Sequence, residues 1–152
     1  LSTRVSEVQG AFMRVQLKRL DKILSRLRER KEILIEALTG VKNISLIRGY
    51  SEAGDCASSL HLRLSDPITA GQASKRLMEN GIIAAFPTLR PAHVAWKWMD
   101  MIEPFEAKAV TASLLPSVQI MMSTIKYDVD YSLTLPQTRA VAKKFRGLLE
   151  TD

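Results

Sequence analysis

Apolar residues recur at helical spacing along residues 1–40. Placed at about 100° per residue, they cover an arc of about 200°, whereas a surface helix of a single domain needs a stripe only a little over 100° wide. The arc is formed by Val5, Val8, Phe12, Met13, Val15, Leu17, Leu20, Ile23, Leu24 and Leu27. The pattern predicts one long helix whose first half packs on another domain or another subunit.

The ends of this helix carry recognisable signals. Ser6 and Gln9 have the spacing of a capping box, although Ser2 or Thr3 could begin the helix a few residues earlier. Gly40 follows the last position of the helical pattern, as expected for a residue that ends a helix.

Beyond Gly40 the pattern changes to short segments. Leu60, Leu62 and Leu64 alternate with polar residues, as in a half-buried strand. Strands are predicted at 43–50, 57–65, 82–86 and 117–125, and helices at 69–80, 104–115 and 134–149, the last opened by a capping box of Thr134 and Gln137. The order predicts an α+β fold: a small, mostly antiparallel sheet of three or four strands with helices packed on one face.

The formal charge of +6 lies on the first helix. Residues 1–50 hold 11 Lys and Arg against 5 Asp and Glu, whereas the rest of the chain is balanced. Such asymmetry can mark a nucleic-acid surface. However, residues 28–32 mix both signs, which is more typical of a solvated helix face, and a nucleic-acid reader usually adds base-reading or aromatic groups.

Little in the sequence indicates catalysis by this chain alone. Its two histidines have no metal-binding spacing, and there is no glycine-rich phosphate loop. Cys56 is the only cysteine, so neither an intrachain disulfide nor a cysteine-based metal cluster is expected, which fits the cytoplasm. The neighbouring Asp55 would oppose formation of its thiolate. No apolar run is long enough to span a membrane, and no leader peptide is apparent.

One loop concentrates candidate binding residues. The stretch "FPTLRPAHVAWKW" places Arg90, His93, Trp96 and Trp98 after a strand, between and beyond two prolines. Loops held by a scaffold often carry binding groups, but a buried aromatic cluster with a hydrogen-bonded histidine is the alternative interpretation. His61 alternates with leucines and is expected at a surface or an interface.

The sequence also resembles a known family. The stretch "TRVSEVQGAFMRVQLKRLDKIL" is similar to a helix of the DegT/DnrJ/StrS family of pyridoxal-phosphate-dependent sugar aminotransferases, which typically opens N-x-R-M-S-E-L-Q-A-A and continues through Q-L-x-x-L-D-x-I. "SKRLMENGIIAAFPTLRPAHVAW" and "LTLPQTRAVAKKFRGLL" resemble later parts of the same family, so that the likeness spans nearly the whole chain.

The resemblance implies that residues 1–40 form a helix linking to a missing large domain, and that residues 41–152 form the small C-terminal α+β domain of a fold-type-I enzyme. Such enzymes move an amino group, usually from glutamate or glutamine, to a keto sugar, often nucleotide-linked. The lysine that anchors pyridoxal phosphate lies upstream in the family, so this chain alone is expected to be inactive.

The resemblance also assigns roles to four residues. Arg4 corresponds to an arginine that reaches the cofactor phosphate of the neighbouring subunit in a homodimer, and Ser2 stands where the family has asparagine. His93, with Arg90 near it, corresponds to a histidine close to the sugar. Two alternatives stay open: a non-catalytic, self-associating interaction module, and a basic nucleic-acid-binding domain.

Overall fold

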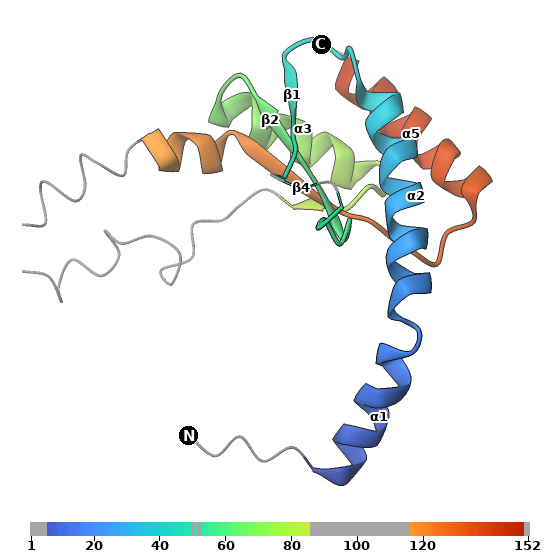
Figure 1. Cartoon of the computed structure of the whole chain (residues 1–152). Coiled ribbons are helices and arrows are strands. Elements are labelled where there is room, and N and C mark those ends of the chain that lie inside the picture. The colour runs from blue at the N-terminus through green and yellow to red at the C-terminus, as the bar shows by residue number, and fades with distance from the viewer. Residues whose placement is uncertain (1–5, 50, 52, 86–115, 151–152) are drawn as a thin grey trace, which may run out of the picture.

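The structure is a computed structural model of the chain and describes residues 6–49, 51, 53–85 and 116–150. Its elements are α1 (Glu7–Leu17), α2 (Leu20–Leu38), β1 (Ile44–Ile47), β2 (Ser59–Leu64), α3 (Pro67–Glu79), β3 (Ala84–Ala85), β4 (Thr124–Asp128) and α5 (Leu135–Glu150). A further helical segment covers residues 116–122. Figure 1 shows α2, α3 and α5 gathered around the sheet, while α1 extends away from them.

The described strands form one four-stranded sheet in the order β1-β2-β4-β3. All three pairings are antiparallel. In the register, His61 of β2 lies opposite Ile47 of β1 on one side and opposite Lys126 of β4 on the other. The predicted α+β fold, with a small antiparallel sheet of three or four strands, is confirmed.

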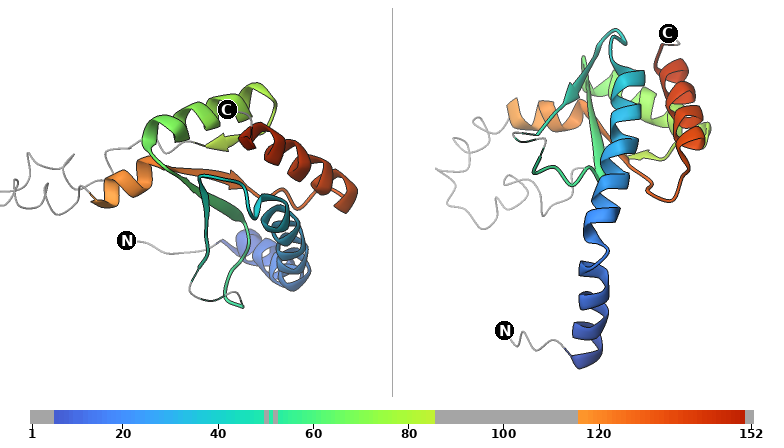
Figure 2. Two further views of the ribbon diagram at one scale, coloured as in Figure 1. Left: turned by 90° about the horizontal axis from the view of Figure 1, so that it is seen from above. Right: turned by 45° about the vertical axis from the view of Figure 1, so that its right-hand side comes forward.

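Helices α2, α3 and α5 cover one face of this sheet (Figure 2). Leu60, Leu62 and Leu64 point into the core beneath them, as their alternation predicted. Phe145 of α5 is fully buried and meets the ring of Tyr127 edge-on, with ring centroids 5.4 Å apart. The other face of the sheet carries the polar residues of β2 and β4, as expected for an antiparallel sheet with one covered face.

The predicted helix ends are largely confirmed. The Gln9 amide donates to the Ser6 hydroxyl at 3.2 Å and the Ser6 amide donates to the Gln9 side chain at 3.1 Å, which completes a capping box. Gly40 adopts φ +81° after α2, a conformation in which glycine carries no steric cost. At Thr134 only half of the box forms, because its amide donates to Gln137 at 2.8 Å while its hydroxyl donates to the same oxygen.

Two predictions about the elements are wrong. The first helix is not continuous, since Lys18 and Arg19 separate α1 from α2. The strand predicted at 117–125 is instead a helical segment at 116–122 followed by β4. Its last carbonyls accept hydroxyl hydrogen bonds of 2.7 Å from Ser123 and Thr124, and a short apolar run does not by itself distinguish helix from strand.

Three predictions about the fold are not tested by the described residues. The loop after Pro87 and the helix at 104–115 lie outside the described residues. The division at residue 40 stays a prediction. Leu34 and Leu38 of α2 are buried in the core of the sheet and its helices, whereas α1 has no buried residue.

Candidate functional site

The residues assigned by resemblance to cofactor and substrate are not among those that the structure describes. Ser2 and Arg4 precede the described part of α1, and Arg90 and His93 fall in the gap between β3 and residue 116. Their roles towards the cofactor and the substrate stay predictions. The described residues contribute a different kind of site: an exposed arm and the contacts that fix its base.

The exposed arm is α1, and its surface is strongly apolar. Val8 is 80% exposed, Phe12 65% and Leu17 66%, with Met13 and Val15 also more than half exposed. Large apolar side chains gathered in this way on the surface of a domain mark a site that binds another surface. This exposure agrees with the prediction from the sequence that residues in the first half of the long helix pack on another domain or another subunit.

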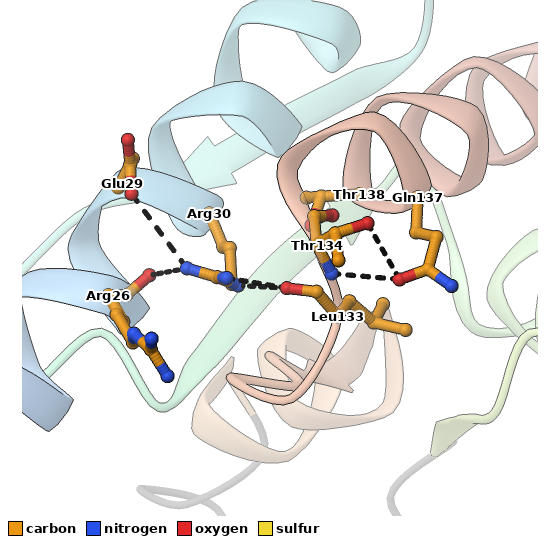
Figure 3. A network of polar contacts seen from close by, with 7 residues as sticks. All are labelled: Arg26, Glu29, Arg30, Leu133, Thr134, Gln137 and Thr138. Atoms are coloured by element: carbon orange, nitrogen blue, oxygen red, sulfur yellow. Dashed lines mark hydrogen bonds and ion pairs between the residues drawn. The ribbon is translucent and has the colours of Figure 1, made fainter.

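The basic side chains of residues 28–32 in α2 mainly make hydrogen bonds within the domain. Arg30 is only 6% exposed, and its guanidinium donates from Nε to the Leu133 carbonyl at 2.7 Å and from Nη2 to the same oxygen. Its Nη1 donates to the Arg26 carbonyl at 2.9 Å, and the Glu29 carboxylate lies 3.8 Å away. Figure 3 shows this network joining α2 to the turn before α5. The expectation of a solvated face at residues 28–32 is therefore wrong at Arg30.

Two more basic residues hold the connection between β1 and β2. Arg28 donates to the carbonyls of Asp55 at 3.0 Å and Ala53 at 2.8 Å, and Lys31 donates to the Asp55 carboxylate. The other oxygen of that carboxylate accepts from the Ala57 amide at 2.8 Å. The hydrogen bond from Lys31, followed by that from Ala57, lowers the pKa of Asp55 below its ordinary value. These contacts fix the connection against α2.

His61 lies half-buried on the open face of the sheet, as its alternation with leucines predicted. Burial is the main cause that lowers its pKa, and the positive charges of Lys126 and Lys31 act in the same direction. Lys126 itself pairs with Asp128 at 2.7 Å. His61 is therefore more strongly biased towards its neutral form near pH 7 than a free histidine.

Cys56 is exposed, and its Sγ lies 3.3 Å from the Ser58 hydroxyl. Hydrogen bonding with Ser58 lowers the pKa of the thiol, although the charge of Asp55 acts to raise it, as the sequence predicted. The expected opposition from Asp55 is thus present but is outweighed.

The described lysines do not resemble a cofactor anchor. Lys31 alone among them is not exposed, and its amine is engaged by the Asp55 carboxylate. No group of three metal-binding side chains gathers within the described residues. Among the described helices, none is both long and apolar enough to cross a membrane.

The arrangement of α1 and α2 leading into an antiparallel sheet that helices cover on one face also occurs in solved structures of larger proteins. The chain matches the crystal structure of 3-amino-5-hydroxybenzoic acid synthase with a TM-score of 0.75 and 18% identity, over 98% of this chain and 40% of that one. It matches the aminotransferase TlmJ from Streptoalloteichus hindustanus with a TM-score of 0.66 and 19% identity, over 89% of this chain and 34% of the other.

A third match is to Spr1654 from Streptococcus pneumoniae, assigned as a sugar aminotransferase, with a TM-score of 0.70 and 14% identity. It covers 97% of this chain and 36% of the other. No protein-family model matches the sequence. At these identities the likeness establishes the fold, and the chain spans two fifths or less of each of these three proteins.

Proposed function

We propose that the chain is the C-terminal part of a pyridoxal-phosphate-dependent aminotransferase that transfers an amino group, from glutamate or glutamine, to a keto sugar. The observation that carries this proposal is the fold: 89–98% of the chain superimposes on 34–40% of three proteins named as aminotransferases or as the synthase of an amino acid. The resemblance of the sequence to sugar aminotransferases supports the same activity.

The missing part would be a large domain that covers the apolar side chains of α1. In each of the three similar structures, about 60% or more of the chain lies outside the match, which is ample for such a domain. Phe12 and Leu17 are then buried in the complete enzyme instead of being exposed. Residues 1–40 link the two domains, and residues 41–152 close one side of the substrate cleft.

The cofactor would be held mainly by the large domain. Pyridoxal phosphate supplies the electron-withdrawing ring on which amino transfer depends. In this chain Arg4 would reach the phosphate of the neighbouring subunit in a homodimer, since a guanidinium matches phosphate oxygens with its forked donors. Ser2 would lie beside it. The engagement of Lys31 with Asp55 supports placing the anchoring lysine upstream.

His93 and Arg90 would line the substrate side of the cleft. Their imidazole and guanidinium offer donors for the hydroxyls and phosphates of a nucleotide-linked sugar. The name of one similar protein, a synthase of 3-amino-5-hydroxybenzoic acid, makes a cyclic keto acid a useful second test compound. We place the enzyme in the cytoplasm, because that reducing compartment keeps a single cysteine in its thiol form.

The proposal is tested by sequencing the gene upstream of the Leu1 codon and expressing the longer chain. We expect an open frame of about 200 or more further residues, since the chain spans only 34–40% of the similar structures. We also expect a lysine whose replacement abolishes cofactor absorbance, and amino transfer to keto sugars. The 152-residue chain should show no turnover. Turnover by that chain alone, or an upstream frame without a candidate lysine, would contradict the proposal.

A second candidate function is a self-associating module. The exposure of Phe12 and its neighbours favours it, because two copies of α1 could cover one another. Sedimentation of the 152-residue chain over a range of concentrations measures this directly. Nucleic-acid binding has weaker support, since the side chains of Arg28, Arg30 and Lys31 are already engaged within the domain; steeply salt-dependent binding of duplex or single strands would restore that alternative.

A further inference from the structure

The joint between α1 and α2 departs from regular helical hydrogen bonding. The Lys18 amide reaches the Arg14 carbonyl only at 3.4 Å, and the Arg19 amide donates at 3.0 Å to Gln16, three residues back instead of four. The four-residue spacing resumes where the Ile23 amide donates to Arg19 at 3.0 Å. The helix is therefore interrupted for about one turn.

The interruption leaves the first turn of α2 uncapped. Amides at the start of a helix have no carbonyl of a preceding turn to bond, and here they belong to residues 20–22. Arg19, the residue at the capping position, makes no side-chain hydrogen bond to them. By contrast, α1 begins with a complete capping box at Ser6. The second start is therefore much less well stabilised than the first.

The local sequence does not call for an interruption. Gln16, Leu17, Lys18, Arg19 and Leu20 all rank among good helix formers, and this stretch holds no glycine, proline or β-branched residue. A broken ladder in such a segment costs hydrogen bonds without a local gain. Lys18 and Arg19 both keep right-handed helical backbone dihedrals, so a small rotation of the backbone separates the interrupted form from a continuous helix.

The apolar stripe runs in phase through the joint. Met13, Leu17, Leu20, Leu24 and Leu27 follow one another at steps of four and three residues, which keeps them on one side of a continuous helix. Exposure rises along the stripe, from 8% at Leu27 in the core to 42% at Leu20 and 66% at Leu17. A surface that covered this stripe would adjoin the core of the domain itself.

We infer that Lys18 and Arg19 form a joint that closes into one continuous helix, from Glu7 to Leu38, when the large domain covers the stripe on α1. Closure gives the amides of residues 20–22 carbonyl partners in the preceding turn. This inference rests on the proposed function for the identity of the covering domain.

The joint is tested first in the 152-residue chain, by amide hydrogen exchange resolved by NMR. We expect the amides of residues 20–22 to exchange faster than those of residues 27–35 in the same helix. Arg19→Asn and Arg19→Ala form a matched pair, since asparagine suits a helix start and alanine a helix interior. Exchange at residue 20, whose amide a capping asparagine does not bond, should be about fivefold faster in the asparagine variant than in the alanine variant, which favours the continuous helix.

The second test uses the longer chain with its large domain. Exchange of the peptide spanning residues 17–23 should slow by about tenfold or more relative to the 152-residue chain. Equal protection at residues 20–22 and 27–35 in the 152-residue chain, equal rates in the two Arg19 variants, or unchanged exchange in the longer chain would each overturn the inference. An upstream frame without a lysine-bearing domain would instead refute the proposed function. The comparison of the two Arg19 variants does not depend on that function.

Discussion

Replacing Arg30 with methionine should destabilise the domain by about 2 kcal/mol. The guanidinium gives the Leu133 carbonyl two donors and ties the turn before α5 to α2. Hydrogen bonds from a charged donor contribute about 1.5–3 kcal/mol, and the partly buried Leu133 carbonyl would lose both donors. Methionine keeps most of the length of the side chain, so the loss comes from the polar contacts.

Two smaller effects, of opposite sign, modify this value. Removing a charge that is 6% exposed relieves its desolvation, which offsets part of the loss. The ion pair with Glu29 adds less than about 1 kcal/mol, because that carboxylate is 54% exposed and 3.8 Å away. The Arg26 carbonyl keeps its place in the helical ladder. The net effect therefore depends mainly on the Leu133 carbonyl.

Thermal and urea unfolding of the 152-residue chain measure the change. About 2 kcal/mol corresponds to a fall in melting temperature of about 4–8 °C for a chain of this size. Arg26→Met is the matched control, since this side chain is exposed, and it should change stability by less than about 0.5 kcal/mol. Arg30→Lys should fall between the two because an amine lacks the fork. Equal stability of Arg30→Met and Arg26→Met would refute this reasoning.

Acid should destabilise the domain through Asp66, whose pKa is lowered to about 2 mainly by hydrogen bonds from Thr69. Because the folded-state pKa lies below the ordinary 3.8, the stabilisation is complete above that value and is lost as the pH falls towards 2. In the Asp66→Ala variant the urea midpoint of unfolding should therefore fall less steeply between pH 4 and pH 2 than in the unaltered chain. An equally steep fall would contradict this. Asp55 is lowered in the same direction by Lys31, so Asp55→Asn should also reduce the loss on acidification, measured in the same titration. Phe145→Ala should cost about 3–5 kcal/mol in urea unfolding, whereas Phe12→Ala, at a residue 65% exposed, should leave stability within about 0.5 kcal/mol; similar losses in the two variants would mean that α1 is buried in this chain.

Local signals in the sequence accounted for most of the fold. Alternation placed Leu60, Leu62 and Leu64 on the buried face of β2, and the Ser6 capping box begins α1 as predicted. The segment at 116–122 was predicted wrongly because three adjacent apolar residues fit either a strand or a buried helix. The hydroxyls of Ser123 and Thr124 donate to carbonyls in the last turn of that helix, and no periodicity reveals those contacts.

The fastening role of Arg30 was missed for a related reason. Its position did carry a signal, because it follows Leu27 by three residues and precedes Leu34 by four, which puts it in phase with the apolar stripe of α2. Its acceptor, Leu133, lies 103 residues further along the chain. A sequence pattern shows that such an arginine faces the core, but only the packing of α2 against α5 supplies its partner.

Contacts between arginines and backbone carbonyls also explain part of the positive charge of the chain. Arginines of this domain repeatedly donate to backbone carbonyls at the ends of elements: Arg28 to the connection after β1, Arg30 to the turn before α5, and Arg146 to Ala37 at 2.8 Å near the end of α2. An arginine used in this way adds a positive charge without offering a binding surface. The excess of basic residues in the first fifty is therefore partly a consequence of how the domain is held together. The apolar side of α1, not its charge, is the feature that calls for a partner.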